Sequence, residues 1–389
     1  MHILVIPSEH FVTYRSPLGG IFQYEQANAL SKNGHKVGVI SVGQISLRYL
    51  MQSYPYDKRE TKKGLTIFRK YVRSLLLERF IPQSFNFERH LKLFKDLYFD
   101  YEEEFGKPEV VHAHNFFYAG FMAKWLRETR DIPFVLTEHS SAFAMGDVSS
   151  TCDSMLEGVA DAADQLTCVS RRLKNLLQGR FKRNFGLLPN LVDANFFEVD
   201  LGDTFNRSHF TILSVGSLDQ NKNHKMLLRA FAAEFRNRLA VLKIAGEGPL
   251  YTELQDLAES LCISSQVCFL GRLSRKEVRD EMLSAHCFVH PSNYETFGVV
   301  LIEALACGLP LIATRSGGPE DIVNQDNGIL VDANSEVQMA TAMRLVEQNL
   351  TKFDRKKLRN EALNKFGDVA FVKNAVANYE EAIKNARNY

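Results

Sequence analysis

The sequence has few cysteines, no long hydrophobic run and almost no net charge. Its six cysteines form no CxxC pair, so there is no zinc-ligand spacing or disulfide framework, and we expect buried thiols in a reducing compartment. No run of about 18 uncharged apolar residues occurs, which argues against a membrane-spanning helix. The net charge of +1 argues against a nucleic-acid-binding protein, for which a strongly basic domain is expected.

The N-terminal residues lack the basic and apolar segments of a signal peptide. Residues 1–7 read instead as a first β-strand. A length of 389 residues with 45% hydrophobic side chains is enough for two large cores. We therefore expect a protein of two domains that is cytoplasmic, or bound at the inner face of the membrane.

Strand patterns alternate with helical patterns along most of the chain, and this alternation predicts parallel, doubly wound sheets. A polar stretch from Asp193 to His209 separates two such series, so we expect domains at 1–192 and 208–367, followed by an amphipathic helix at 368–389. Strands are expected at 3–7, 36–42, 110–113, 134–137, 165–169, 210–215, 240–245, 266–270, 287–290 and 309–314. Residues 43–73 show no regular pattern.

The most informative segment carries Glu295 and Glu303. It passes from an apolar strand through a polar loop into an apolar helix that ends before Gly308, typical of a helix C-terminus. In open α/β sheets such a loop lies at the ligand-binding edge, where a helix N-terminus attracts phosphate. A buried, ionised glutamate needs donors, which a sugar diol supplies. Alternatively, Glu303 pairs with an Arg or Lys and Glu295 is ordinary loop polarity.

Three further loops carry residues suited to a diphosphate. Gly19 and Gly20 precede the first helix and allow close approach of phosphate. Lys222, in the loop that begins at Gly216, can neutralise a leaving diphosphate. Gly246 follows the next strand of the second domain. Each has a simpler interpretation as turn chemistry or, for Lys222, as a solvated cation.

Three histidines follow strands of the first domain. His112 and His114 end one strand, and His139 follows the next, so all three are expected at one edge of the sheet. They are candidates for a substrate site, for a metal site or for ordinary structural roles. Neither an HExxH motif nor a His-plus-carboxylate spacing is present, so we expect no metal.

Residues 58–95 form the most basic segment. They contain eleven Lys and Arg against three Glu, a charge of +8 that leaves −7 for the rest of the chain. Phe and Leu residues are mixed among the cations. This composition suits a surface helix resting on anionic lipid, or a solvated face covering the core of the first domain.

The glutamate segment resembles the signature of retaining nucleotide-sugar glycosyltransferases of family four, which have the GT-B fold. Residues 290–298 read HPSNYETFG and residues 303–310 read EALACGLP. The resemblance implies an α/β architecture of two Rossmann-like doubly wound domains facing a central cleft. It also implies that the C-terminal helix crosses back onto the first domain.

The resemblance also implies roles for the candidate residues. Glu295 would face the donor sugar, Glu303 the ribose, and His139 the opposite face of the sugar. The other implied donor-side residues are Gly19, Gly20, Gly216, Lys222, Gly246, Thr296, Phe297, Gly298 and Val299. His112 and His114 would lie on the acceptor side. The chain departs from many relatives at Ser217, where they carry an Arg, so Arg272, Lys225 or a backbone amide would have to compensate.

The expected activity is transfer of a hexosyl group from a UDP-sugar or GDP-sugar to a glycan or lipid-linked acceptor, with retention at the anomeric carbon. No cofactor beyond the donor substrate is expected. Two alternatives stay open: a sugar-nucleotide epimerase of similar architecture, and a catalytically idle sugar-nucleotide-binding partner in a polysaccharide assembly complex.

Overall fold

The computed structural model describes residues 1–8, 19–45, 57–62, 65–73, 83–148, 152–198, 200–201 and 209–387. The chain folds into two compact units. The first consists of Met1–Val169, Leu173–Asn190 and Phe371–Tyr389, and the second of Ser170–Arg172 and Leu191–Ala370. Each unit has its own parallel β-sheet with covering helices, which confirms the predicted α/β class with two Rossmann-like domains.

In the described part of the first unit, eight strands form a sheet in the order β3-β4-β2-β1-β5-β6-β7-β8. They are β1 (His2–Ile6), β2 (Lys36–Ile45), β3 (Asp57–Lys62), β4 (Leu65–Arg73), β5 (Val110–His114), β6 (Phe134–Glu138), β7 (Gln165–Cys168) and β8 (Gly186–Leu187). The neighbours are parallel, except that β3 and β4 are antiparallel. The central strands β5 and β6 are buried along their whole length, as expected when helices cover both faces.

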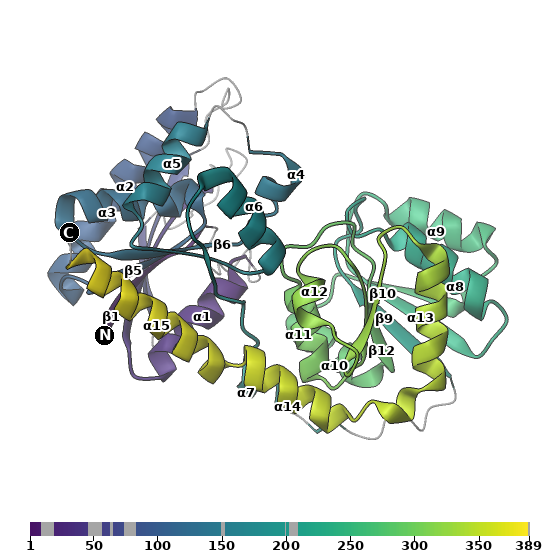
Figure 1. Ribbon diagram of the computed structural model, residues 1–389. Helices are drawn as coiled ribbons and strands as arrows, with labels where there is room; N and C mark the ends of the chain where they lie inside the picture. Colours follow the sequence, from purple (N-terminus) through teal and green to yellow (C-terminus); the bar gives the residue numbers. More distant parts are fainter. Residues whose placement is uncertain are drawn as a thin grey trace. The chain divides into compact units, whose positions relative to one another are not determined.

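Helices cover both faces of this sheet. Figure 1 shows α2, α3 and α5 on one side of it and α1 and α15 on the other. The helices of the first unit are α1 (Ile21–Lys32), α2 (Gln83–Phe105), α3 (Phe121–Arg130), α4 (Ala142–Met145), α5 (Asp153–Ala162), α6 (Arg171–Phe181) and the C-terminal α15 (Asp368–Ala386). Helix α15 buries Phe371, Ala375, Tyr379 and Ala382.

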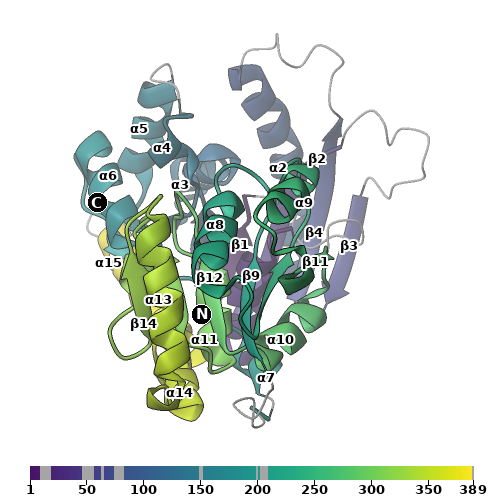
Figure 2. The same cartoon turned by 90° about the vertical axis from the view of Figure 1, so that its right-hand side faces the viewer.

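The second unit has six parallel strands in the order β11-β10-β9-β12-β13-β14. They are β9 (Phe210–Val215), β10 (Ala240–Ala245), β11 (Val267–Gly271), β12 (Cys287–His290), β13 (Leu311–Thr314) and β14 (Gly328–Val331). Its helices are α7 (Ala194–Phe197), α8 (His224–Phe235), α9 (Tyr251–Ser260), α10 (Arg275–Ser284), α11 (Val299–Ala306), α12 (Pro319–Ile322), α13 (Glu336–Gln348) and α14 (Arg355–Phe366). Helices α8 and α13 pack side by side (Figure 2).

Helix α11 has the predicted boundaries. Cys307 caps its C-terminus, and Gly308 follows with a φ of 74°. A Cβ on Gly308 would lie 2.8 Å from the carbonyl oxygen of Arg355, so both the left-handed backbone and the close packing favour glycine here.

The predicted lack of pattern at 43–73 was wrong where the structure describes this stretch. Strand β2 runs on to Ile45, and β3 and β4 form an antiparallel pair. The basic segment is therefore a surface helix only from Gln83 onward, whereas its first described part is strand. Its residues 63–64 and 74–82 lie outside the described residues. Among the described residues, no helix combines the length and apolar composition that a membrane crossing needs.

Candidate active site

Two loops of the second unit meet at the carboxyl ends of neighbouring strands. Strands β9 and β12 pair in parallel, with Cys287 opposite Ile212, so the loops that follow them emerge at the same edge of the sheet. Asn221 joins these loops. Its side-chain amide donates to the carbonyl oxygen of Tyr294, and its Oδ1 accepts the N–H of Tyr294, both at 3.0 Å. Sequence analysis had not identified Asn221 as a site residue.

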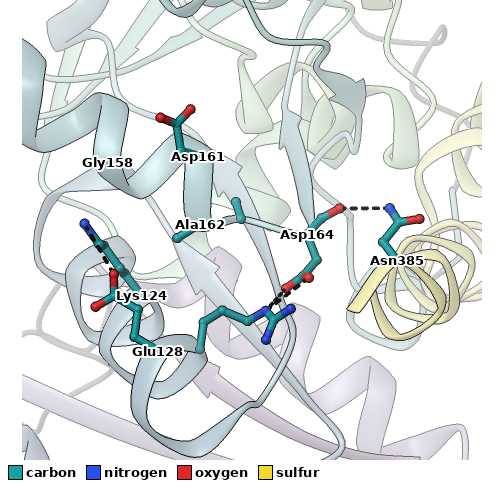
Figure 3. A pocket seen from close by; sticks show the side chains of 9 residues that line it. Lys124, Glu128, Gly158, Asp161, Ala162, Asp164 and Asn385 are labelled. Atoms are coloured by element: carbon teal, nitrogen blue, oxygen red, sulfur yellow. Dashed lines mark hydrogen bonds and ion pairs between the residues drawn. The ribbon is translucent and has the colours of Figure 1, made fainter. Parts of the chain in front are cut away.

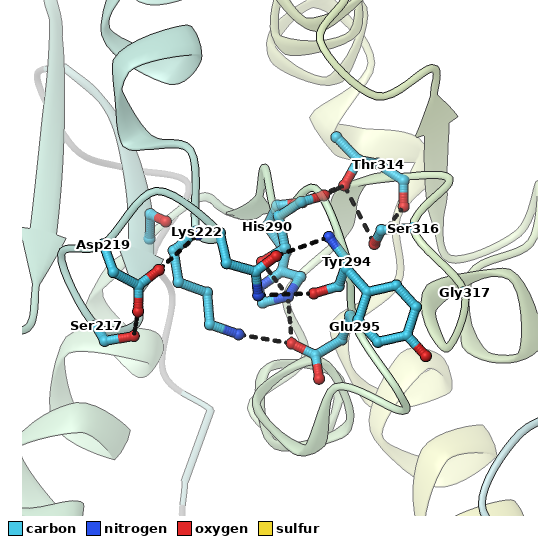
Figure 4. Close-up of polar contacts among 12 residues, drawn as sticks. Ser217, Asp219, Lys222, His290, Tyr294, Glu295, Thr314, Ser316 and Gly317 are labelled. Atoms are coloured by element: carbon cyan, nitrogen blue, oxygen red, sulfur yellow. Dashed lines mark hydrogen bonds and ion pairs between the residues drawn. The ribbon is translucent and has the colours of Figure 1, made fainter. Parts of the chain in front are cut away.

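Lys222 and Glu295 form an ion pair between the two loops. The Lys222 Nζ donates to Oε2 of Glu295 at 2.7 Å, and Nε2 of His290 lies 3.1 Å from the same oxygen (Figure 4). The side chains of Lys222 and Glu295 are 22% and 16% exposed. The two residues predicted to hold different parts of the donor are thus in direct contact, with some of each surface still reachable from solvent.

The charge state of Glu295 depends on opposing effects. Burial raises the pKa of this carboxyl, but the hydrogen bond from His290 and the charge of Lys222 outweigh burial and lower the pKa to about 2. Burial lowers the pKa of His290, although Glu295 opposes that shift. The imidazole is therefore neutral at pH 7 and carries its proton on Nε2, which donates to the carboxylate. Glu295 is ionised throughout the physiological range.

Ser217 takes part in the same loop but does not supply a positive charge. Its Oγ donates to Oδ2 of Asp219 at 2.6 Å, and Oδ1 of Asp219 accepts the N–H of Lys222 at 3.0 Å. These contacts fix the backbone at Lys222. Lys225, one of the predicted substitutes for the missing Arg, instead donates to Glu253 at 2.5 Å, so it is engaged on the helical side of the loop.

Gly216 and Gly246 lie where the loops after β9 and β10 touch. The N–H of Gly216 donates to the carbonyl oxygen of Ala245 at 3.0 Å. Gly246 has a φ of 148°, and a Cβ there would lie 1.8 Å from the carbonyl oxygen of Gly216. Only glycine fits this contact. Gly246 therefore has a structural reason to be glycine, the turn-chemistry alternative for this position.

The start of helix α11 is held from below by a second loop. Phe297 is only 2% exposed, so its side chain anchors the loop in the core. The N–H of Gly318 donates to the carbonyl oxygen of Glu295 at 2.7 Å. Gly298 is the N-cap residue, with a φ of 95°, and Thr296 and Val299 are partly exposed. The first-turn N–H groups have no partner within the helix and are suited to an anion.

Glu303 is the fifth residue of α11, and an arginine accompanies it. Its Oε1 lies 3.6 Å from a guanidinium nitrogen of Arg275. Burial raises the pKa of the Glu303 carboxyl, and the charge of Arg275 opposes that shift. The pairing with an Arg that the sequence left as an alternative is therefore present.

The first unit brings its three predicted histidines together. Nδ1 of His114 lies 3.0 Å from Nε2 of His139, and His112 bonds through Nε2 to Thr137 and through Nδ1 to Tyr379, both at 2.8 Å. Burial lowers the pKa of His112 and of His139 to about 3 and that of His114 well below its usual value. All three rings are therefore neutral at pH 7. In the described part of the chain, no group of three or more His, Cys, Asp or Glu could hold a metal ion.

Helix α1 begins beside the histidine cluster. Gly20 is its N-cap residue, with a left-handed φ of 65°, and the ring of Phe22 lies 5.0 Å from the ring of His139. The predicted glycine-rich segment thus ends next to a predicted site histidine. Residues 9–18 of the preceding loop lie outside the described residues.

Glu138 is a buried carboxyl that sequence analysis did not select. It accepts the N–H groups of Phe116, His139 and Ser140 at 2.7–3.0 Å. Burial nevertheless raises its pKa to about 7. Oδ1 of Asn115 also accepts the N–H of His139 at 2.8 Å. The sequence signal for these residues was their position at the ends of buried strands.

A surface pocket of about 840 Å³ on the first unit lies apart from these residues (Figure 3). Arg127 pairs with Asp164 at 3.2 Å and Lys124 pairs with Glu128 at 3.7 Å. The pocket is lined by Lys124, Arg127, Glu128, Gly158, Asp161, Ala162, Ala163, Asp164 and Asn385. None of the predicted site residues lines it, so we assign it no role.

Two Rossmann-like units, one of them carrying a lysine and a glutamate on adjoining strand-end loops, define a glycosyltransferase of the GT-B fold. Family models support this class over both halves of the chain. Residues 20–196 match Glycosyltransferase Family 4 and residues 203–365 match Glycosyl transferases group 1. The chain belongs to the GT-B glycosyltransferases of the family-four type.

Similar proteins include enzymes of glycolipid synthesis. The chain is 27% identical over 312 residues to the gpi3 protein of the phosphatidylinositol N-acetylglucosaminyltransferase of Schizosaccharomyces pombe, and 28% identical over 331 residues to a protein of the human phosphatidylinositol N-acetylglucosaminyltransferase. These matches cover 78% and 81% of this chain but 63% of each relative. An uncharacterised glycosyltransferase of Methanocaldococcus jannaschii is 28% identical, with 78% of each chain covered.

Solved structures show the same fold at low identity. Sucrose-phosphate synthase from Thermosynechococcus elongatus superposes with a TM-score of 0.75 at 20% identity and covers 99% of this chain and all of that one. Anabaena HepE, solved with UDP and glucose, has a TM-score of 0.72 at 16% identity and covers 97% of this chain and 98% of its own.

Replacing Lys222 should destabilise the second unit, because a mostly buried carboxylate would lose its cation. We expect Lys222→Met to lower the free energy of unfolding by about 1–3 kcal/mol at pH 7, measured by urea denaturation. The pKa of Glu295 is depressed, so its stabilising contribution is present above the unfolded pKa and is lost as the pH falls toward 2. The difference from wild type should therefore be constant above about pH 5 and narrow below it.

The matched control is Lys225→Met, which breaks the pair with Glu253, a side chain that is 57% exposed. We expect a loss below about 1 kcal/mol there, because water screens the pair. Equal losses in the two variants would mean that the Lys222–Glu295 contact is an ordinary surface pair.

Proposed function

We propose that this glycosyltransferase moves a hexosyl group from a nucleotide diphosphosugar to an acceptor hydroxyl, with retention at the anomeric carbon. The observation that carries the proposal is the Lys222–Glu295 contact. It places a cation suited to phosphate against an ionised acceptor suited to sugar hydroxyls. These two groups suit the two halves of a sugar diphosphate.

In this proposal the donor binds to the second unit. Lys222 and the first-turn N–H groups of α11 neutralise the diphosphate, whose charge grows as the glycosidic bond breaks. Glu295 accepts hydrogen bonds from hydroxyls of the transferred sugar, and Glu303 accepts them from the ribose. Binding replaces part of the Lys222–Glu295 pair with phosphate, so the cation exchanges one anion for another and no charge is left unpaired.

The acceptor is proposed to bind to the first unit, near the histidine cluster. Neutral imidazoles both donate and accept hydrogen bonds, which suits hydroxyl groups better than anions. His139 is proposed to face the donor sugar. The acceptor hydroxyl attacks the anomeric carbon as the diphosphate leaves, and the leaving phosphate takes the hydroxyl proton. Because several relatives are named for phosphatidylinositol glycosylation, a lipid-linked acceptor is the first class to test.

The decisive experiment incubates the purified protein with UDP-hexoses and GDP-hexoses, with and without lipid-linked and glycan acceptors, and follows the products by mass spectrometry and NMR. The proposal expects acceptor-dependent release of the nucleoside diphosphate and a product with the anomeric configuration of the donor. Isomerised donor without acceptor would identify an epimerase. Binding without turnover of any donor would identify an idle partner, and an inverted product would refute retention.

The two glutamates should affect different kinetic constants. We expect Glu303→Ala to weaken nucleotide binding by about tenfold or more, because a ribose contact is present in the ground state and in the transition state alike. Glu295→Ala should mainly lower kcat, because a sugar contact strengthens as the anomeric centre flattens. Calorimetry with UDP and GDP together with turnover measurements checks this assignment. Equal loss of nucleotide affinity in both variants would reverse the roles.

Activity should not require a divalent metal if Lys222 and backbone amides neutralise the leaving diphosphate. We expect turnover in excess EDTA to equal turnover without chelator. A Lys222→Ala variant should be slowed in both conditions and not rescued by added ions. Loss of wild-type activity in EDTA with recovery on adding manganese or magnesium would overturn this mechanism.

Helix α2, which begins within the basic segment, supports a proposed membrane contact. Its Phe85 and Phe99 side chains are 47% and 50% exposed, and Lys92 is exposed nearby. The Nζ of Lys95 lies 5.1 Å from the ring centre of Trp125. Aromatic side chains beside cations suit the interface of an anionic membrane, where a lipid-linked acceptor resides.

Vesicle flotation tests this contact. We expect the protein to float with anionic vesicles at low salt and less at physiological salt, because the charge attraction is screened. Phe99→Ser should reduce flotation severalfold, whereas Val337→Ser, which removes a side chain that is 78% exposed on the second unit, should not. A protein that stays soluble with anionic vesicles at low salt has a solvated basic face only.

A further inference from the structure

Arg275 is the charged group that contacts Glu303. It is the first residue of α10, whose start is fixed by a capping box between Ser274 and Glu277. Its guanidinium lies 3.6 Å from Glu303 Oε1, and the two side chains are 21% and 17% exposed. A long, flexible side chain keeps one orientation only when further contacts hold it.

Those further contacts come from α7, the short helix that follows the junction of the two units in sequence. The guanidinium carbon of Arg275 lies 4.2 Å from the ring centre of Phe196 and 5.7 Å from that of Phe197. Arg279 contacts Phe196 as well, at 4.7 Å from the ring and with a 2.9 Å hydrogen bond to its carbonyl oxygen. The planar guanidinium of Arg275 thus has aromatic rings and the Glu303 carboxylate as neighbours, an arrangement suited to arginine and not to lysine.

We propose that Arg275 is a positioning residue for nucleotide binding: held by Phe196, it orients the Glu303 carboxylate and keeps it ionised to accept the ribose hydroxyls. The inference rests on the proposed function, because it takes Glu303 as the ribose-binding residue. It adds that α7, which touches no part of the proposed donor contacts, influences nucleotide affinity through one arginine.

The charges around Glu303 make this inference testable by pH. Burial raises the pKa of Glu303, and Arg275 opposes the shift. The neighbouring charged groups are Arg279 on α10 and Arg355 and Arg359 on α14, which stay protonated. Burial raises the pKa of the Cys307 thiol on α11 to about 12. Among these described neighbours, Glu303 alone is positioned to titrate between pH 6.5 and 9.

The experiment measures the affinity of the full chain for UDP and for GDP by calorimetry at several pH values from 6.5 to 9. For the nucleotide that wild type binds, we expect Arg275→Met to weaken binding by about tenfold at pH 7, and the deficit to narrow as the pH rises and Glu303 ionises without help. Phe196→Leu should show a smaller deficit with the same pH trend. Arg275→Lys, which keeps the charge, should recover part of the affinity at pH 7.

Two controls separate positioning from general damage. Lys276→Met removes an exposed charge from the next position of α10 and should leave affinity unchanged. In a Glu303→Gln background, Arg275→Met should cause no further loss, because the group it acts through is gone. An additional tenfold loss there would show that Arg275 acts by another route and would overturn the inference.

The remaining outcomes distinguish this inference from the function on which it rests. If wild type binds neither UDP nor GDP, the proposed function fails and this inference fails with it. If wild type binds one of them and Arg275→Met changes the melting temperature but neither the affinity nor its pH profile, the arginine is structural. The positioning role is then wrong and the proposed function stands.

Discussion

The ion pair between Lys222 and Glu295 is the interaction on which the arrangement of the second unit's ligand edge depends. It joins two loops separated by 73 positions in sequence, and it forms only because β9 and β12 are neighbours in the sheet. Asn221 and Asp219 hold the lysine side of the contact, while His290 holds the glutamate side. The surrounding polar contacts therefore fix two opposite charges next to each other before any ligand arrives.

The two units solve different electrostatic problems. The second concentrates full charges and balances each with a partner, as a site for a dianionic ligand requires. The first surrounds its histidines with apolar strands, so that burial keeps the rings neutral. A neutral, hydrogen-bonding surface suits hydroxyl groups, and a balanced charged surface suits a diphosphate. The chemistry assigned to each unit thus follows from how much water its strand ends admit.

The sequence predicted those features whose cause is local. Alternating apolar patterns gave the order of strands, and Gly308 marked the end of α11 because a left-handed position favours glycine. Strands β3 and β4 were missed, because the many cations of β4, such as Arg69 and Lys70, hide a strand pattern. Asn221, Glu138 and the Arg275–Glu303 pair depend on which strand lies beside which. Spacing along the chain does not carry that information.

One feature of the first unit bears on how the chain is made. Tyr379 of α15 bonds His112 in the centre of the first sheet, and both side chains are buried. All of the second unit lies between them in sequence, so a ribosome must translate that unit before the tyrosine emerges. During synthesis the first unit therefore waits with an uncovered sheet face while the second completes its own core. The order of translation exposes apolar surface of one domain for the time that the other takes to be made.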